Sequence, residues 1–143
     1  MSTPVHSGSG RDASIVVARD GKGLVALLSA GFPRHGGEYL FLPGGRQEEG
    51  ETPEECAQRE LREEAGVTGS SWRSLGSYAI TLGSTARVHL FEATGLTLGP
   101  QQLTSGEVDY ELSWWPVEEA IDAAAAGRFL LPAGPLALML ALR

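Results

Sequence analysis

Residues 44–67 read GGRQEEGETPEECAQRELREEAGV and are the most informative part of the chain. Thr52 suits the N-cap of a helix, Pro53 suits the first helical position, and Glu55 completes a capping box with Thr52. The helical pattern continues up to Gly66, a residue that readily adopts the left-handed conformation of a C-terminal cap. The sequence therefore predicts a helix that begins after Thr52 and ends before Gly66.

One side of this helix is strongly acidic. Residues three and four apart share a helix face, so Glu60, Glu63 and Glu64 gather on one arc. Like charges at this spacing repel, and a bound Mg²⁺ ion, which prefers carboxylate and phosphate oxygens, would relieve the repulsion. An apolar stripe runs beside the acids and is the natural side to pack on a sheet; it consists of Ala57, Leu61 and Ala65.

A solvated acidic helix face is the alternative interpretation. Two features favour a site instead. The glycine-rich bend at residues 43–45 and the loop up to Gly50 directly precede the helix, so exposed backbone can approach a ligand beside its N-terminus. In addition, residues 48–64 hold eight carboxylates and only two arginines, whereas a solvated helix usually alternates the signs of its charges.

The composition of the whole chain excludes several classes of protein. Its 143 residues, 42% hydrophobic and 20% charged, are typical of one globular domain. The net charge of −7 argues against a general nucleic-acid-binding surface. The single cysteine, Cys56, excludes a disulfide within the chain and a cysteine cage for a metal. Because we find neither a secretory signal nor an apolar run of the ~20 residues that cross a bilayer, we expect a cytoplasmic protein without a membrane partner.

The remaining pattern predicts an α/β domain layered on a mixed sheet. Apolar runs at residues 13–18 and 24–28 flank turn-forming residues and are expected to form a hairpin. We expect a flexible tail over residues 1–12 and a single domain over residues 13–143. Further strands are expected over residues 38–42, 72–82, 86–94 and 112–117, and further helices over residues 118–126 and 132–142.

The spacing around the acidic helix resembles the signature of the Nudix hydrolases, G-x5-E-x7-R-E-U-x-E-E-x-G-U, in which U is apolar. Every specified position is present, from Gly45 through Glu51 to the run RELREEAGV at residues 59–67. The resemblance implies an α/β/α sandwich. It also implies hydrolysis of a pyrophosphate linkage in a nucleoside diphosphate joined to another moiety, with Mg²⁺ or Mn²⁺ as cofactor.

Roles for individual residues follow from the resemblance, position by position. Glu60, Glu63 and Glu64 would be metal-binding carboxylates, with Glu60 and Glu64 also counted as catalytic. Gly44 would offer its backbone carbonyl to the metal. The residues that would orient neighbours or shape the site are Gly45, Glu51, Arg59 and Gly66. Such an acidic site would repel a polyphosphate unless divalent ions intervened.

The identity of the general base stays open at this point. One candidate is Glu60, inside the motif. In other family members a glutamate from a later loop, a few residues before a strand that contains tryptophan, completes the site. Here Glu107 and Glu111 both precede Trp114 at suitable distances, and Glu107 is the preferred catalytic candidate. The alternative for each is a solvated loop acid.

Aromatic residues give a weaker indication of where a nucleoside binds. Trp114 and Trp115 alternate along a predicted strand, so one is expected to face inward and the other outward. Phe32, Tyr39 and Tyr78 are candidates for a nucleoside pocket. Packing in the core is the preferred interpretation of all five.

Three functions remain open. The segment 76–95, the acidic stretch 107–111 and the closing helix resemble ADP-ribose and nucleotide-sugar pyrophosphatases. The first alternative is a nucleoside triphosphate pyrophosphohydrolase of the housecleaning type, and the second is a non-catalytic nucleotide-binding module. The expected partner is a small nucleoside diphosphate-type substrate, and the resemblance also suggests a homodimer.

Overall fold

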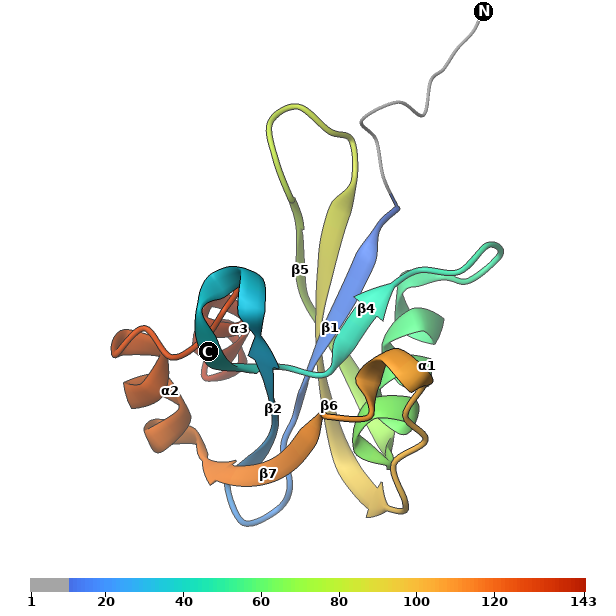
Figure 1. Cartoon of the computed structure of the whole chain (residues 1–143). Helices are drawn as coiled ribbons and strands as arrows, with labels where there is room; N and C mark the ends of the chain where they lie inside the picture. Colours follow the sequence, from blue (N-terminus) through green and yellow to red (C-terminus); the bar gives the residue numbers. More distant parts are fainter. Residues whose placement is uncertain (1–10) are drawn as a thin grey trace, which may run out of the picture.

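The computed structural model describes residues 11–143 of the chain, and most of the expected tail, residues 1–12, lies outside the described residues. Figure 1 shows the arrangement of the helices and strands. In chain order the elements are β1 (Ala13–Ala18), β2 (Leu24–Phe32), the short 3-10 helix η1 (Pro33–His35), β3 (Gly37–Phe41), β4 (Gly44–Arg46), α1 (Pro53–Ala65), β5 (Val67–Ala79), β6 (Arg87–Leu98), the 3-10 helix η2 (Ser105–Glu107), β7 (Glu111–Pro116), α2 (Val117–Ala125) and α3 (Ala133–Ala141). Within this part of the chain, no helix is both long and apolar enough to span a membrane.

The strands form two sheets. The first has the order β4-β1-β6-β5, in which β1 and β6 run parallel and the other neighbours run antiparallel. The second has the order β3-β2-β7 and is antiparallel throughout. The predicted α/β class with a mixed sheet is confirmed, with the addition of the second sheet.

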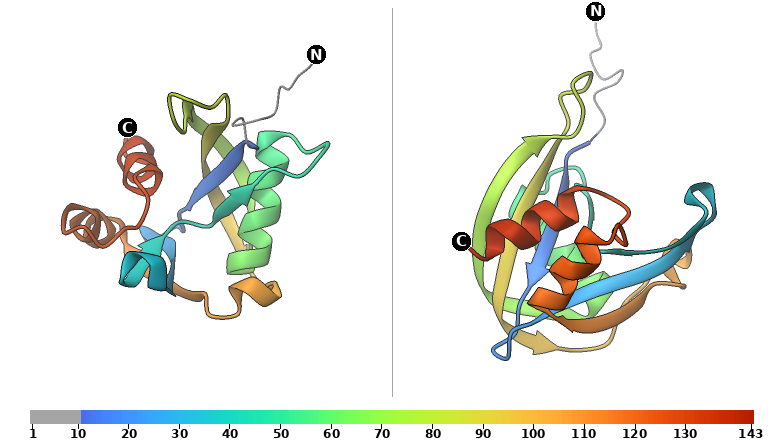
Figure 2. Two further views of the ribbon diagram at one scale, coloured as in Figure 1. Left: turned by 45° about the horizontal axis from the view of Figure 1, so that its top comes forward. Right: turned by 90° about the vertical axis from the view of Figure 1, so that its left-hand side faces the viewer.

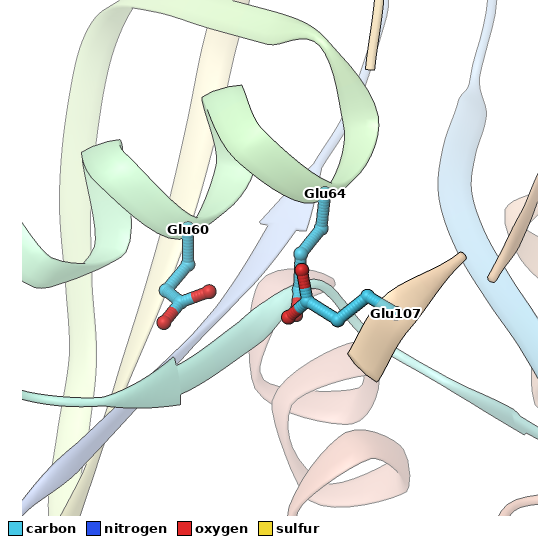
Figure 3. Close-up of side chains that lie close together, drawn as sticks. All are labelled: Glu60, Glu64 and Glu107. Carbon is cyan, nitrogen blue, oxygen red and sulfur yellow. The ribbon is translucent and has the colours of Figure 1, made fainter. Parts of the chain in front are cut away.

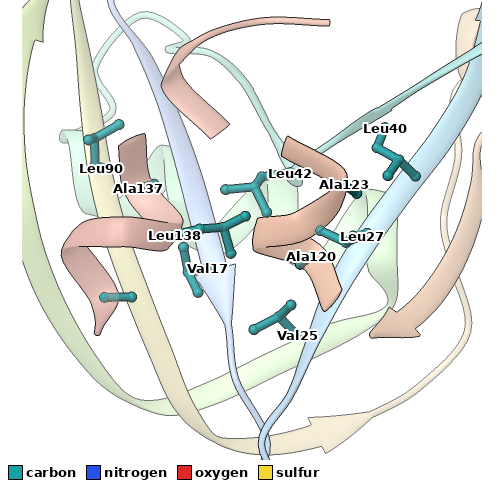
Figure 4. Close-up of a cluster of buried hydrophobic side chains, with 11 residues drawn as sticks. Val17, Val25, Leu27, Leu40, Leu42, Leu90, Ala120, Ala123, Ala137 and Leu138 are labelled. Carbon is teal, nitrogen blue, oxygen red and sulfur yellow. The ribbon is translucent and has the colours of Figure 1, made fainter. Parts of the chain in front are cut away.

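Helices cover both sides of the first sheet, as expected for an α/β/α sandwich (Figure 2). Because side chains alternate along a strand, Val16 and Val17 of β1 enter different cores. Val16 packs with Leu61 of α1, and Val17 packs with Leu138 of α3 (Figure 4). Burial of an aliphatic side chain of this size contributes about 1.5–3 kcal/mol, so β1 holds the layers together.

The expected hairpin between β1 and β2 is wrong. A turn does form, in which the Asp20 carboxylate accepts hydrogen bonds from the backbone N–H groups of Lys22 and Leu24. Beyond one isolated bridge between Arg19 and Val25, the two strands separate into different sheets. The reason is that both strands are central. Each one already has a neighbour along both edges, so neither has an edge left for the other.

Helix α1 has the predicted ends. The Thr52 hydroxyl accepts a hydrogen bond from the backbone N–H of Glu55, and the Glu55 carboxylate accepts one from the backbone N–H of Thr52. Gly66 follows the helix with φ of +69°. The apolar stripe of α1 is fully or almost fully buried, as the sequence predicted for the side of the helix that packs on a sheet. Its members are Ala57, Leu61 and Ala65.

The residues before the helix, expected to form only a bend, contain the short strand β4. Gly44 pairs with Ile15 and Gly45 pairs with Ser14, at the edge of the first sheet. A Cβ atom on Gly44 would collide with the backbone carbonyl of Ser14, so only glycine permits this close approach. Strand β4 thereby lies directly beside α1.

Candidate metal centre and active site

Three carboxylates from two separate elements meet beside α1. Glu60 and Glu64 come from α1, one turn apart, and Glu107 comes from η2 (Figure 3). One oxygen of each carboxylate lies within 4.8 Å of the corresponding oxygens of the other two. Glu60 is only 7% exposed and Glu64 only 3% exposed, although both are acids. We name these three residues the carboxylate cluster.

The loop before η2 is attached to the C-terminal end of α1, and this attachment brings Glu107 to the helix. The backbone N–H of Gln102 donates to the carbonyl of Glu63 (2.7 Å), and the Gln101 side chain donates to the carbonyl of Glu64 (2.8 Å). The last carbonyls of a helix lack partners within the helix, so the loop satisfies them. Thr104 then orients Glu107, because its backbone N–H donates to the Glu107 carboxylate (3.1 Å).

Arg59 organises the acids on the other side of the cluster. Its guanidinium makes two hydrogen bonds to Glu51, at 2.6 and 3.1 Å. It also donates to Glu60 at 3.2 Å and to Glu63 at 3.3 Å. The bond to Arg59 holds the pKa of the Glu51 carboxyl below its ordinary value. Among the described residues, Glu64 has no such ion pair, so Arg59 neutralises the cluster only in part.

Two glycines of β4 shape the space around the carboxylates. The backbone N–H of Gly44 donates to Glu64 at 2.9 Å and fixes one of its oxygens. A Cβ atom on Gly45 would collide with the carboxylate of Glu60, so any other residue there would displace that group. Both glycines were expected at the site from the sequence, but the clearance that Gly45 provides for Glu60 was not.

Burial shifts the protonation of the cluster. It raises the pKa of Glu60 to about 7 and the pKa of Glu64 to about 9. Burial also acts to raise the pKa of Glu107, but hydrogen bonds, with that from the Glu64 carboxyl foremost, outweigh it and lower this pKa below its ordinary value. In the absence of a cation, burial therefore favours a protonated Glu64 carboxyl, which can donate a hydrogen bond to Glu107.

The cluster has the donor set of a hard divalent cation. Mg²⁺ and Mn²⁺ take carboxylate oxygens, and Mg²⁺ binds through one or two of them while it keeps waters and phosphate oxygens as further ligands. Glu60 and Glu64 are nearly buried and face Glu107, and Arg59 is the only cationic side chain among the described residues that pairs with a member of the cluster. The residues therefore fit such an ion.

A cavity of about 560 Å³ opens beside the cluster, and Glu64 lies in its wall. Phe32 and Tyr78, two of the three expected pocket residues, line the cavity, whereas Tyr39 does not. The volume of the cavity is typical of a site that binds a small molecule. Three further aromatic residues that the sequence did not single out also line the cavity; these are Phe41, Tyr110 and Phe129.

Comparison with known proteins agrees with the motif. A sequence model described as the NUDIX domain matches residues 8–133 of the chain. The chain belongs to the Nudix family. The resemblance that the sequence analysis noted is thus confirmed.

Individual Nudix proteins resemble the chain to different extents. The ADP-ribose pyrophosphatase of Mycobacterium tuberculosis is 31% identical over 121 residues, which cover 82% of this chain and 58% of that protein. Diphosphoinositol polyphosphate phosphohydrolase 3-alpha of Mus musculus is 34% identical over 81 residues, or 57% of this chain and 49% of that protein. The chain therefore spans about half the length of these relatives. A crystal structure of an ADP compounds hydrolase shares the fold, with a TM-score of 0.80 and 21% identity over 94% of this chain and 72% of that one.

Other predicted residues of this Nudix domain lie outside the carboxylate cluster. Glu63 is bound to Arg59, and Glu111 is an exposed residue of β7 that pairs with Ser29. Gly66 caps α1 and accepts a hydrogen bond from the backbone N–H of Gly99.

The two tryptophans do not divide into an inward and an outward residue. Trp114 packs against the core that contains α1, and Trp115 packs against the core that contains α2 and α3. Trp115 also lies 5.3 Å below the guanidinium of Arg128. Strand β7 has a core on each face, so both rings are half-buried and neither lines the cavity.

Replacing Arg59 by alanine is expected to destabilise this Nudix domain by about 2–4 kcal/mol, because several partly buried carboxylates lose their shared partner. Urea unfolding of both proteins at pH 8 measures the loss. Arg62→Ala, an exposed arginine of the same helix, is the matched control and should stay within about 0.5 kcal/mol of the unmodified protein. Equal losses in the two variants would show that Arg59 contributes no more than a surface charge.

Proposed function

We propose that the chain hydrolyses a phosphoanhydride bond in a nucleoside diphosphate linked to another group, with Mg²⁺ or Mn²⁺ as cofactor. The observation that carries the proposal is the carboxylate cluster, in which Glu60 and Glu64 of α1 are nearly buried, Glu107 of η2 is partly buried, and Glu64 lines a cavity. Family membership supports the same reaction class. A non-catalytic module has no need for buried acids that disfavour the folded state, so the intact cluster speaks against that alternative.

The metal would be held by Glu60, Glu64 and Glu107, with Glu63 and the Gly44 carbonyl as further ligands that the family resemblance implies. Bound there, a divalent cation would polarise phosphoryl oxygens and lower the pKa of an attacking water. In this proposal Glu60 and Glu64 are both catalytic. Glu63 would need to leave Arg59 to take part, since the two are hydrogen-bonded at 3.3 Å.

The chain's own residues would supply the remaining steps. Arg59 would orient Glu60 and Glu51, and the Gly44 N–H would orient Glu64. We favour Glu107 as the base that takes the proton from water, because it is the least buried carboxylate of the cluster and the Thr104 N–H fixes its position. Its membership in the cluster supports this choice over Glu111, which lies in the neighbouring strand.

ADP-ribose or a nucleotide sugar is the substrate that we favour. The relative in Mycobacterium tuberculosis is named an ADP-ribose pyrophosphatase, and the structure with the shared fold is named an ADP compounds hydrolase. We further propose a single domain over residues 13–143, a cytoplasmic location and a homodimer. Light scattering of the purified chain tests the last point.

Purified protein with 5 mM Mg²⁺ and a panel of ADP-ribose, nucleotide sugars, dinucleoside polyphosphates and nucleoside triphosphates tests the activity. We expect AMP and ribose 5-phosphate from ADP-ribose, with kcat/KM about 10- to 100-fold above that for any nucleoside triphosphate. Glu60→Gln is the negative control. Pyrophosphate and a nucleoside monophosphate as the main products would instead support the triphosphate pyrophosphohydrolase.

A further inference from the structure

The hairpin of β2 and β3 extends beyond the end of the third strand of its sheet, β7. Strand β7 pairs with β2 only as far as Ser29, which lies opposite Glu111. Within the described chain, residues 30–32 of β2 pair with β3 alone. Figure 2 shows the hairpin projecting from the body of the domain. Since the peptide groups of a strand point alternately to its two edges, residues 30–32 leave one strand edge open to pairing.

A cavity of about 650 Å³ lies between this part of the hairpin and the chain that leads into β7. Residues 29–33 and 37–38 line it on one side, and Val108, Asp109 and Glu111 line it on the other. We name this cavity the hairpin notch. The side chain of Val108 is 67% exposed. The notch therefore combines an open strand edge with an exposed apolar side chain.

The hairpin notch and the tip of the hairpin carry opposite charges. Three acids line the notch, Glu38, Asp109 and Glu111, and no arginine, lysine or histidine of residues 11–143 does so. The tip is η1, in which Arg34 and His35 are exposed. In the described part of the chain, neither Arg34 nor any of the three acids forms an ion pair. The tip of one copy of the chain is thus complementary in charge to the notch of another.

We propose that a second copy of the chain occupies the hairpin notch. The two copies pair in antiparallel fashion along residues 30–32 of β2, with Arg34 of each copy beside Asp109 and Glu111 of the other. Main-chain pairing at a free strand edge is a recurring mode of association, and a two-fold axis makes the two contacts identical. The inference specifies the interface of the homodimer that the proposed function includes, and it rests on that part of the proposed function rather than on hydrolysis.

Two-fold symmetry sets the register of this pairing. Antiparallel pairing that uses all three free residues places Gly31 opposite Gly31 of the other copy, and Ala30 opposite Phe32. Gly31 is exposed, and a Cβ atom there would have nothing within 4 Å. The position at the centre of the contact is therefore open to the approach of a second backbone.

The pairing ends at Pro33, where the charged groups of the two copies meet. In this register Pro33 of one copy would lie opposite Ser29 of the other, a position that Glu111 of β7 already occupies. Proline has no N–H group to extend the ladder, and the chain turns there into η1. Arg34 thereby reaches the entrance of β7, where Asp109 and Glu111 lie.

The proposed interface also borders the candidate active site. Phe32 lines both the hairpin notch and the cavity beside the carboxylate cluster. Val108, in the wall of the notch, directly follows Glu107 in the chain. In the dimer the other copy would cover the turn that carries Glu107 and would help to hold this carboxylate in place.

Disulfide crosslinking of the full chain tests the register. Residues that face each other in an antiparallel ladder have Cα atoms about 4.5–5.5 Å apart, within the span of a disulfide. After incubation with oxidised glutathione, we expect Gly31→Cys to run mainly as a crosslinked dimer on a non-reducing gel. Gly21→Cys, at an exposed glycine with equally open surroundings in the turn before β2, is the matched control and should stay monomeric. The native Cys56 is buried in both variants. Equal crosslinking of the two variants would overturn the proposal.

Sedimentation velocity over a range of protein concentrations tests the charges. Arg34→Glu should weaken the dimer about tenfold or more, because each copy loses an attraction and gains a repulsion. Adding Glu111→Arg to this variant should bring the dissociation constant back to within about threefold of that of the unmodified chain. Lys22→Glu makes the same change of charge in the turn before β2, at an exposed position, and should leave the dissociation constant unchanged.

The outcomes separate this inference from the proposed function. A chain that stays monomeric at every concentration would overturn both the inference and the proposed homodimer. A dimer that Arg34→Glu does not weaken would leave the homodimer standing and refute this interface. Neither measurement depends on turnover, so a failure to cleave any phosphoanhydride would contradict the proposed activity while the expected crosslinking and sedimentation would still support the interface.

Discussion

Replacing Glu64 by glutamine will lower metal-dependent hydrolysis by about three orders of magnitude and raise the melting temperature of the metal-free protein. The first effect follows because a metal ligand contributes several kcal/mol to the stabilisation of charge in the reaction, and each 1.4 kcal/mol is tenfold in rate. The second follows because the amide can still accept the hydrogen bond from the Gly44 N–H and can donate to Glu107. At neutral pH the folded state keeps a proton on Glu64 that the unfolded state releases, which lowers stability, and the neutral amide removes this cost.

Steady-state kinetics with ADP-ribose and calorimetric melting in EDTA measure the two effects. We expect the melting temperature of Glu64→Gln to rise by roughly 2–5 °C. Glu54→Gln, an exposed acid in the first turn of the same helix, is the matched control and should change neither quantity. Full turnover by Glu64→Gln would show that this carboxylate does not hold the metal.

The metal-free protein is expected to lose stability as the pH rises from 5 to 8.5. In the folded state burial raises the pKa of Glu60 to about 7 and that of Glu64 to about 9, both above the ordinary value of 4.5. The folded state therefore binds more protons than the unfolded state in this window, and the free energy of unfolding falls with pH. One such group contributes a slope of at most about 1.4 kcal/mol per pH unit.

Magnesium should counteract the loss of stability that the metal-free protein shows as the pH rises. Metal binding requires ionised carboxylates, so at low pH the ion must displace protons. The increase in melting temperature caused by 5 mM Mg²⁺ should consequently be larger at pH 8.5 than at pH 6, by roughly 3 °C or more. Glu64→Gln should flatten the pH dependence in EDTA. A melting temperature of the metal-free protein that is constant or rises over the same range would contradict the prediction.

The sequence predicted α1 to the residue because its signals are local. Thr52, Pro53 and Glu55 set its start, and Gly66 sets its end, all within the helix and its caps. The acidic arc beside the apolar stripe followed from helical periodicity alone. Most strands were found for the same reason, since alternating or continuous apolar runs mark them.

The pairing of those strands could not be predicted in the same way. β1 pairs in parallel with β6, whose paired residues lie 75 positions later in the chain, and this choice depends on the packing of both faces of the sheet. β4 was missed because it has three residues, two of them glycines that carry no strand preference. A turn-forming segment between two apolar runs does not by itself establish a hairpin.

In the candidate site, too, the sequence predicted the features that depend on local spacing but not those that depend on contacts between distant segments. Glu60 and Glu64 were selected by local spacing, and the family resemblance favoured Glu107 over Glu111. The position of Glu107 beside α1, however, depends on how Gln101 and Gln102 bind the end of that helix. No sequence rule identifies those two glutamines. The cavity-lining rings are spread over residues 32–129, so no short motif contains them; the residues missed were Phe41, Tyr110 and Phe129.

The attachment of the loop at residues 99–104 to α1 has an evolutionary consequence. The carboxylate cluster is formed by α1 and η2, and hydrogen bonds between α1 and the loop before η2 hold the two elements together. The β5–β6 hairpin connects α1 to that loop in sequence and extends away from both elements (Figure 1). Ile80, which follows β5 in this hairpin, lines the cavity beside the carboxylate cluster. If the proposed function holds, mutations at this tip would change the wall of the cavity while the carboxylate cluster stays in place, so substrate preference would diverge through one surface segment.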